Sequence, residues 1–267
     1  MNEDINMEKM KFGVQIYTIR DYLTTTPLFE KSIRKLPELG YKYFQLSGEG
    51  EGVTTPKRLR ELMDETGLVC GLTHWDDKEI VGNTEKCIED HDIMGVDGIG
   101  IGGMPGEFRN YEGYSRFIEK YAPAVEKIGK AGKSFCYHNH WFEFERFENG
   151  KTGLEMLLEG MPEGFKLTFD TAWAQIAGID CAAFIRKYGD RIFATHFKDL
   201  TVVDNNLQVT ELLTGNINFD AIVEACKEAG IEWNFVEQDT VRRYNLYDSI
   251  KVSLDNIMGR YGDYFLQ

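Results

Sequence analysis

The chain alternates short apolar runs with longer segments in which apolar residues recur every three or four positions. The first pattern is typical of buried β-strands and the second of amphipathic helices. Strands are predicted to begin near Phe12, Tyr41, Leu68, Gly98, Phe135, Phe165, Ile192 and Trp233. Helices are predicted over 24–39, 56–66, 79–94, 111–131, 152–158, 181–188, 220–229 and 248–261. Glycines such as Gly40 and Gly67 follow these helices, as left-handed C-caps require, and Pro123 is expected to kink or end its helix.

Strands that alternate with helices imply parallel pairing with right-handed crossovers. Eight such units close into a (β/α)8 barrel more naturally than into an open sheet. An open doubly wound sheet usually carries a glycine-rich phosphate loop after its first strand, whereas residues 17–22 here read YTIRDY. We therefore predict a single-domain TIM barrel over residues 1–267, with residues 1–10 as a frayed N-terminal extension.

Composition narrows the class of protein. Its 267 residues are 42% hydrophobic, which is enough for a sizeable core, and the formal net charge is −14. Such a charge disfavours nucleic-acid partners, because their binding depends on Lys and Arg at phosphates. The five cysteines are dispersed, as expected of free thiols in a reducing compartment. The charged N-terminus lacks a signal-peptide core, and no apolar run approaches the ~20 residues of a membrane span. We expect a cytoplasmic protein without a membrane partner; a homo-oligomer is possible.

The candidate chemistry begins in the stretch KSFCYHNHWFEF, residues 133–144. Strand alternation places Cys136, His138 and His140 on one face. Taken alone, His138 and His140 would be interpreted as hydrogen-bonded histidines of the core or rim. However, three later apolar runs also end in ligand-type side chains, at Asp170, His196 and Glu237.

In a barrel, residues at the C-terminal ends of the strands meet at one mouth. We therefore expect His138, Asp170, His196 and Glu237 to bind one divalent ion. Mixed imidazole and carboxylate ligands suit Mn²⁺, Co²⁺, Mg²⁺ or Zn²⁺. The structural alternatives are a helix cap for Asp170 and an ion pair with Arg242 or Arg243 for Glu237.

Other residues at strand ends suit a polyol. The side chains expected to contact sugar hydroxyls are Gln15, Tyr17, Gln45 and His74, and Trp173 offers a ring face. Tyr17 and Trp173 could equally be core aromatics. Lys198 follows His196 by two positions and so points into the same mouth, where it could stabilise an enolate. An ion pair with Asp199 or another acid at the rim is the alternative.

At this point the chain resembles the xylose isomerase-like TIM-barrel family, which includes sugar phosphate isomerases and epimerases, inosose dehydratases and endonuclease IV. The resemblance runs nearly end to end. It rests on FGVQIYTIRD (12–21), YHNHWFEF (137–144), FDTAWAQIAGID (169–180), HFKD (196–199) and FVEQD (235–239). The family's usual metal set of Glu, Asp, His and Glu implies ligand roles for Asp170, His196 and Glu237.

Three positions depart from the family pattern. His138 stands at the strand-five glutamate position, as in the branch that carries YHNH, and Glu143 could take its place only through a bulge. Trp173 and Gln45 replace a common histidine and a common glutamate. Because the strand-five carboxylate of the paired acid and base is missing, we expect His140, a neutral imidazole with a pKa near physiological pH, to act as the base. Glu237 and Lys198 are the other catalytic candidates.

The resulting functional prediction is a divalent-metal-dependent isomerase or epimerase of a sugar or sugar phosphate. It would abstract a proton next to a carbonyl through a metal-stabilised enediolate. The alternative is a lyase or dehydratase that acts on a keto-sugar or keto-inositol. An endonuclease IV-type activity is disfavoured, because it needs a trinuclear zinc cluster and a basic groove, whereas this chain has five histidines and a charge of −14. A non-catalytic sugar-binding barrel is a further possibility.

Overall fold

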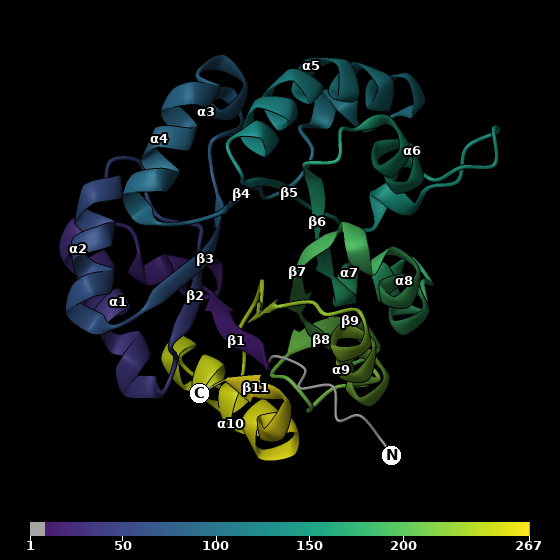
Figure 1. Ribbon diagram of the computed structural model, residues 1–267. Coiled ribbons are helices and arrows are strands. Elements are labelled where there is room, and N and C mark those ends of the chain that lie inside the picture. The colour runs from purple at the N-terminus through teal and green to yellow at the C-terminus, as the bar shows by residue number, and fades with distance from the viewer. Residues whose placement is uncertain (1–8, 267) are drawn as a thin grey trace, which may run out of the picture.

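The computed structural model describes residues 9–266, and its centre is a closed barrel of parallel strands (Figure 1). The barrel strands are β1 (Met10–Gln15), β2 (Tyr43–Leu46), β3 (Val69–His74), β4 (Gly98–Ile101), β5 (Ser134–His138), β6 (Phe165–Asp170), β7 (Ile192–Phe197) and β10 (Trp233–Val236). Each pairs in parallel with its neighbours, and β10 pairs with both β7 and β1, which closes the sheet. The short β11 (Phe265–Leu266) adds to the start of β1. The predicted eight-stranded barrel is confirmed.

Helices surround the strands as an outer ring (Figure 1). They are α1 (Thr26–Leu39), α2 (Pro56–Thr66), α3 (Asp77–Gly82), α4 (Thr84–Met94), α5 (Tyr111–Lys130), α6 (Gly153–Gly160), α7 (Thr171–Ile176), α8 (Cys181–Tyr188), α9 (Phe219–Glu228) and α10 (Leu246–Tyr261). Gly40 and Gly67 end α1 and α2 in the left-handed conformation, with φ of 98° and 73°. Their predicted role as C-caps is therefore confirmed. Within the described residues, no helix is both long and apolar enough to cross a membrane.

Several boundaries differ from the prediction. The helix expected over 79–94 is two helices that meet at Asn83. The first strand ends at Gln15, because the Gln15 side chain accepts the N–H of Tyr17 and starts a 3-10 helix over Ile16–Tyr22. Helix α5 continues through Pro123. Of the expected frayed extension, residues 1–8 lie outside the described part of the chain, whereas Met10 belongs to β1.

A hairpin that the sequence analysis did not predict follows β7. Strands β8 (Asp199–Val203) and β9 (Asn206–Thr210) pair antiparallel. Their turn consists of Asp204 and Asn205, both at positive φ, of 50° and 63°. Two positive φ values fit a two-residue hairpin turn, and Asp and Asn tolerate that conformation better than most residues. The hairpin therefore follows β7 directly, at the end of the barrel where β7 ends.

The barrel interior holds its own small apolar cluster of Leu72, Cys136, Ala194 and Phe235, separate from the larger core. Since side chains alternate along a strand, the residues two positions further on point toward the same interior. Those residues are His74, His138, His196 and Glu237. The apolar layer thus forms a floor on which the polar residues of the strand ends stand. All five cysteines are buried free thiols.

Candidate functional site

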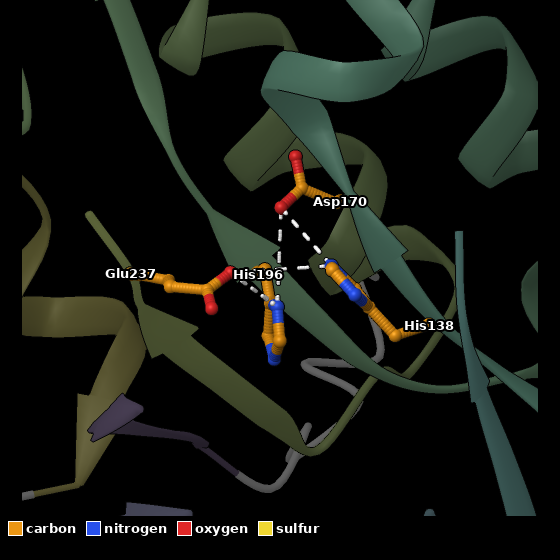
Figure 2. Close-up of side chains that lie close together, drawn as sticks. All are labelled: His138, Asp170, His196 and Glu237. Atoms are coloured by element: carbon orange, nitrogen blue, oxygen red, sulfur yellow. Dashed lines mark hydrogen bonds and ion pairs between the residues drawn. The ribbon is translucent and has the colours of Figure 1, made fainter. Parts of the chain in front are cut away.

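Four ligand-type side chains converge at the C-terminal ends of β5, β6, β7 and β10 (Figure 2). One side-chain atom each from His138, Asp170, His196 and Glu237 lies within 4.8 Å of the other three. The Nε2 of His138 is 3.3 Å from Oδ2 of Asp170, and the Nδ1 of His196 is 2.9 Å from Oε2 of Glu237. All four residues are at most 3% exposed. The structure therefore brings together the four residues predicted as ligands.

The two imidazoles are held so that each turns one nitrogen toward the carboxylates. Nδ1 of His138 is 3.0 Å from the carbonyl oxygen of Gly102, and Nε2 of His196 is 2.7 Å from Oε1 of Gln45. Because both oxygens only accept hydrogen bonds, these outer nitrogens carry the protons. The inner nitrogens, Nε2 of His138 and Nδ1 of His196, face the carboxylates and would offer their lone pairs to an ion bound between them.

Two of the inner atoms lack a hydrogen bond of good geometry. They are Nδ1 of His196 and Oε2 of Glu237, both buried. Two imidazole nitrogens with two carboxylate oxygens form the donor set of a divalent metal. The residues present therefore fit a metal ion.

Asp170 caps a helix, which was the structural alternative to a ligand role, and it also faces the site. Its Oδ1 accepts the backbone N–H of Trp173 at 2.9 Å and caps α7. Its Oδ2 is the oxygen near His138. The cap fixes the orientation of the carboxylate, and the backbone N–H of Asp170 is itself held by Oδ1 of Asn139 at 3.0 Å. Structural and ligand roles are thus combined in one side chain.

A buried ammonium group completes the cluster. Nζ of Lys198 lies 2.9 Å from Asp170, 2.8 Å from Glu237 and 3.0 Å from Asp239. Burial disfavours all of these charges. At Lys198, Asp170 and Glu237 the mutual attraction outweighs burial, whereas at Asp239 burial prevails and raises the pKa of the carboxyl. The pKa of Lys198 is therefore raised, that of Asp170 is lowered, and that of Glu237 lies well below its ordinary value. Of the alternatives considered for Lys198, the pairing with Asp199 is not found among the described residues, where Asp199 instead accepts the backbone N–H groups of Gly215 and Ile217. The pairing with another acid is found at Asp239.

The predicted base, His140, lies next to the cluster but differs from the expectation in its pKa. Its ring centroid is 4.8 Å from that of His138 and 5.6 Å from that of Trp173. Burial and the neighbouring His138 lower the pKa of His140 to about 3, so the expected pKa near physiological pH is wrong. The imidazole is neutral, and its Nδ1 has no partner in the described structure.

The residues expected to contact a sugar divide into two groups. His74 and Trp173 are half-buried and each has a buried ring N–H or nitrogen, Nε2 and Nε1, without a hydrogen-bond partner in the described structure. The His74 ring lies 5.5 Å from that of His138. Tyr17 is half-buried, with the Arg20 guanidinium 4.4 Å from its ring. By contrast, Gln15 and Gln45 are fully buried: Gln15 approaches His74, and Gln45 accepts from His196.

The sequence analysis missed one charged residue of the site and left another open. Asp239 was not singled out, although it follows Glu237 by two positions, the spacing that placed Lys198 beside His196. Glu143, considered as a substitute for His138, does not join the ligands. It is fully buried, accepts from the Tyr137 hydroxyl at 2.6 Å and from the His140 N–H at 2.8 Å, and so fixes the turn after β5.

A cavity of about 550 Å³ adjoins the site through His74. The 46–56 segment after β2 and the residues after β3 form most of its wall. Its carboxylates are Glu49, Glu51, Asp76, Glu79 and Asp90, and none of its lining residues is a lysine or arginine. Burial raises the pKa of Glu49. Lys86 pairs with Asp90, so the other carboxylates of the wall make the cavity electronegative, and its polar groups are suited to hydroxyl donors.

Comparison with known proteins places this geometry in a family. The sequence model of the xylose isomerase-like TIM barrel matches residues 33–250, and no curated protein matches the chain. Three solved structures share the fold over nearly the whole chain. The first is a sugar phosphate isomerase/epimerase from Parabacteroides distasonis, with TM-score 0.77, 19% identity, and coverage of 97% of this chain and 96% of that one.

The second is a probable 3-DHS dehydratase from Bacillus anthracis, with TM-score 0.73, 15% identity, and coverage of 94% and 99%. The third is an IOLI protein with a bound zinc atom, with TM-score 0.72, 14% identity, and coverage of 97% and 100%. At these identities the structural likeness establishes the fold, while the sequence match spans most of the chain. This chain belongs to the xylose isomerase-like TIM barrel family.

Proposed function

We propose that the protein is a divalent-metal-dependent enzyme that isomerises or epimerises a keto-sugar by moving a proton on the carbon next to the carbonyl. The observation that carries this proposal is the convergence of four buried ligand atoms within 4.8 Å of one another at the barrel mouth. The description of one fold neighbour as a sugar phosphate isomerase/epimerase supports the reaction class. When bound by His138, Asp170, His196 and Glu237, a divalent ion would polarise the carbonyl oxygen and offset the charge that develops there.

The proton transfer itself is assigned to side chains of the protein. Lys198 stays protonated among three carboxylates and cannot act as a base. The carboxylate of Glu237 already contacts Lys198 and His196 and would be a ligand of the ion, so it is not free to accept the proton. His140 is neutral, half-buried and has a ring nitrogen without a partner in the described structure. We assign it as the proton acceptor, because negative charge developing on the adjacent substrate oxygen favours the imidazolium.

Substrate hydroxyls would be bound by groups that now lack partners. Nε2 of His74 and Nε1 of Trp173 are buried and unpaired in the described structure, and hydrogen bonding to a sugar would remove that cost. Gln45 acts behind the site, where it fixes the proton on the outer nitrogen of His196. Gln15 and Tyr17 border the His74 side of the mouth.

The charge of the adjoining cavity bears on whether the substrate is phosphorylated. Its wall contains five carboxylates and no cationic side chain. A phosphate group there would be repelled, whereas neutral hydroxyls would find acceptors. We therefore favour an unphosphorylated keto-sugar over a sugar phosphate.

The test is a screen of unphosphorylated keto-sugars and inososes in D₂O, with protein stripped by EDTA and then supplied with Mn²⁺, Co²⁺, Mg²⁺ or Zn²⁺. Proton NMR should show exchange at the carbon next to the carbonyl only after an ion is added. Asp170→Ala with Glu237→Ala serves as the matched inactive protein. Absence of exchange with every ion, together with absence of metal binding, would refute the proposal.

One observation favours a dehydratase as the second candidate. The paired-carboxylate arrangement for epimerisation needs an acid at the strand-five position, where this chain has His138, and Glu143 is turned away to Tyr137 and the His140 backbone. With His140 on one side only, the imidazolium formed by proton removal could return that proton to a β-hydroxyl on the same face, which would leave as water, so no second carboxylate is needed. In the same NMR screen, an unsaturated product in place of an isomer or epimer would identify the lyase.

A further inference from the structure

The ammonium of Lys198 contacts the same two oxygens that face the histidines. Nζ lies 2.9 Å from Oδ2 of Asp170 and 2.8 Å from Oε2 of Glu237. Oδ2 of Asp170 is also the atom approached by His138, and Oε2 of Glu237 is the atom approached by His196. Lys198 is fully buried, so no solvent screens these contacts. A metal ion held by the four ligands would need the two oxygens that now pair with the ammonium.

Lys198 has two further partners outside the ligand set. Oδ2 of Asp239 lies 3.0 Å from Nζ, and the Asp239 side chain is 32% exposed, unlike the ligand carboxylates. The Trp173 ring lies 4.9 Å from the same ammonium. A carboxylate and an aromatic face both attract a cation. The ammonium can therefore remain paired if the two ligand oxygens are taken by another cation.

From this geometry we infer that Lys198 is an internal cation that competes with the divalent ion for Asp170 and Glu237, and that Asp239 holds the ammonium when the ion is bound. This inference rests on the metal site of the proposed function and adds two positioning residues to it. Lys198 and Asp239 should then set metal affinity in opposite directions. Without Lys198, the carboxylates lose their resident counter-charge and attract an ion more strongly. Without Asp239, the ammonium loses its carboxylate partner outside the ligand set, so it stays paired with Asp170 and Glu237 and competes more strongly with the ion.

The test is calorimetric titration of EDTA-stripped protein with Mn²⁺. Lys198→Met should lower the Kd by at least ~10-fold, because like charges this close in a buried site repel strongly. Asp239→Asn should raise the Kd. In a Lys198→Met background, however, Asp239→Asn should change the Kd much less than it does in the parent, since its effect acts through the ammonium. Equal effects in both backgrounds would overturn the role of Asp239.

Lys133→Met is the matched control. Lys133 is also a buried lysine that pairs with two acids, Asp92 at 2.9 Å and Asp97 at 3.5 Å. It precedes β5 and so lies at the opposite end of the barrel from His138. The substitution changes the net charge by the same amount as Lys198→Met and should leave the Kd for Mn²⁺ unchanged.

Thermal unfolding provides a second measurement that does not depend on the Kd for the ion alone. Stripped Lys198→Met should unfold at a lower temperature than the stripped parent, and added Mn²⁺ should raise its unfolding temperature more than it raises that of the parent. If Lys198→Met does not fold, Lys198→Gln together with Asp239→Asn provides the same comparison. If the parent binds Mn²⁺ and neither Lys198 variant binds it more tightly, the inference is wrong while the metal site stands. If neither the parent nor any variant binds Mn²⁺, both the inference about Lys198 and the proposed metal site are refuted.

Discussion

Acidification should destabilise the fold through His91, a residue outside the candidate site. His91 lies on α4, is fully buried, and bonds at both ring nitrogens. Nε2 is 2.8 Å from the Thr73 hydroxyl, and Nδ1 is 2.7 Å from the carbonyl oxygen of Cys87. The carbonyl requires a proton on Nδ1, so the neutral ring accepts from Thr73 at Nε2. A second proton would break that arrangement, and burial lowers the pKa of His91 to about 4.

The sign and size of the effect of His91 on the free energy of unfolding follow from the difference between its folded and unfolded pKa values. The pKa of an unfolded histidine is about 6.5, and that of folded His91 is about 4. Between these values the unfolded chain binds more protons, so stability is fully present above about pH 6.5 and falls as the pH decreases. The loss from His91 is about 2 kcal/mol at pH 5 and approaches about 3 kcal/mol below pH 4, at ~1.4 kcal/mol per pKa unit.

Urea unfolding of the parent and of His91→Gln from pH 7 to pH 4.5 measures this contribution. The glutamine amide can still donate to Cys87 and accept from Thr73, but it does not titrate. At pH 7 the variant should be the less stable protein, because the ring leaves a gap in packing. The difference in free energy of unfolding should then shrink by about 2 kcal/mol by pH 5. A difference that stays constant with pH would refute the reasoning.

Three further predictions concern the site. Asp170→Ala and Glu237→Ala should each lose bound metal in elemental analysis, and Asp170→Ala should also cost about 1 kcal/mol of stability as its helix cap is removed; full metal retention in both would contradict the ligand assignment. Gln45→Leu should weaken metal binding by about 10- to 100-fold in titration, because His196 loses the acceptor that fixes its protonated nitrogen. His140→Gln should lower turnover by ~100-fold or more with metal still bound; near-full turnover would exclude His140 as the base.

The barrel and the convergence of the four proposed ligands could be predicted from the sequence because both depend on local periodicity. Alternation along a strand decides that a residue two positions beyond a buried interior residue points the same way. Cys136 and His138, or Ala194 and His196, illustrate this spacing. Repeated in four strands, the pattern needs no long-range information beyond the closure of the barrel.

The remaining parts of the site depend on contacts between distant segments. Gln45 reaches His196 across 151 positions in the sequence, and the sequence alone suggested a sugar contact for it. The pKa of His140 depends on how deeply the turn after β5 is buried, which Glu143 determines through the His140 backbone. The hairpin at 199–210 was missed because its strands alternate weakly and lie outside the barrel. Each of these features is set by tertiary packing that periodicity does not record.

Strand register shows why the four ligands meet although they do not share one level of the barrel. Asp170 lies opposite His196 in the β6–β7 pair, but His138 lies opposite Thr168, two residues earlier on β6. On the other side, His196 lies opposite Phe235, so Glu237 is two residues further along its strand. The ligands therefore rise by one side-chain layer from β5 to β6 and again from β7 to β10, which is the stagger that strand tilt imposes on a closed barrel. His138 from the lowest level, Asp170 and His196 from the middle level and Glu237 from the highest level converge on one point. A glutamate at position 138 would reach that point from the lower layer with a different length and direction, so the replacement of a carboxylate by histidine changes both the charge and the geometry of the site.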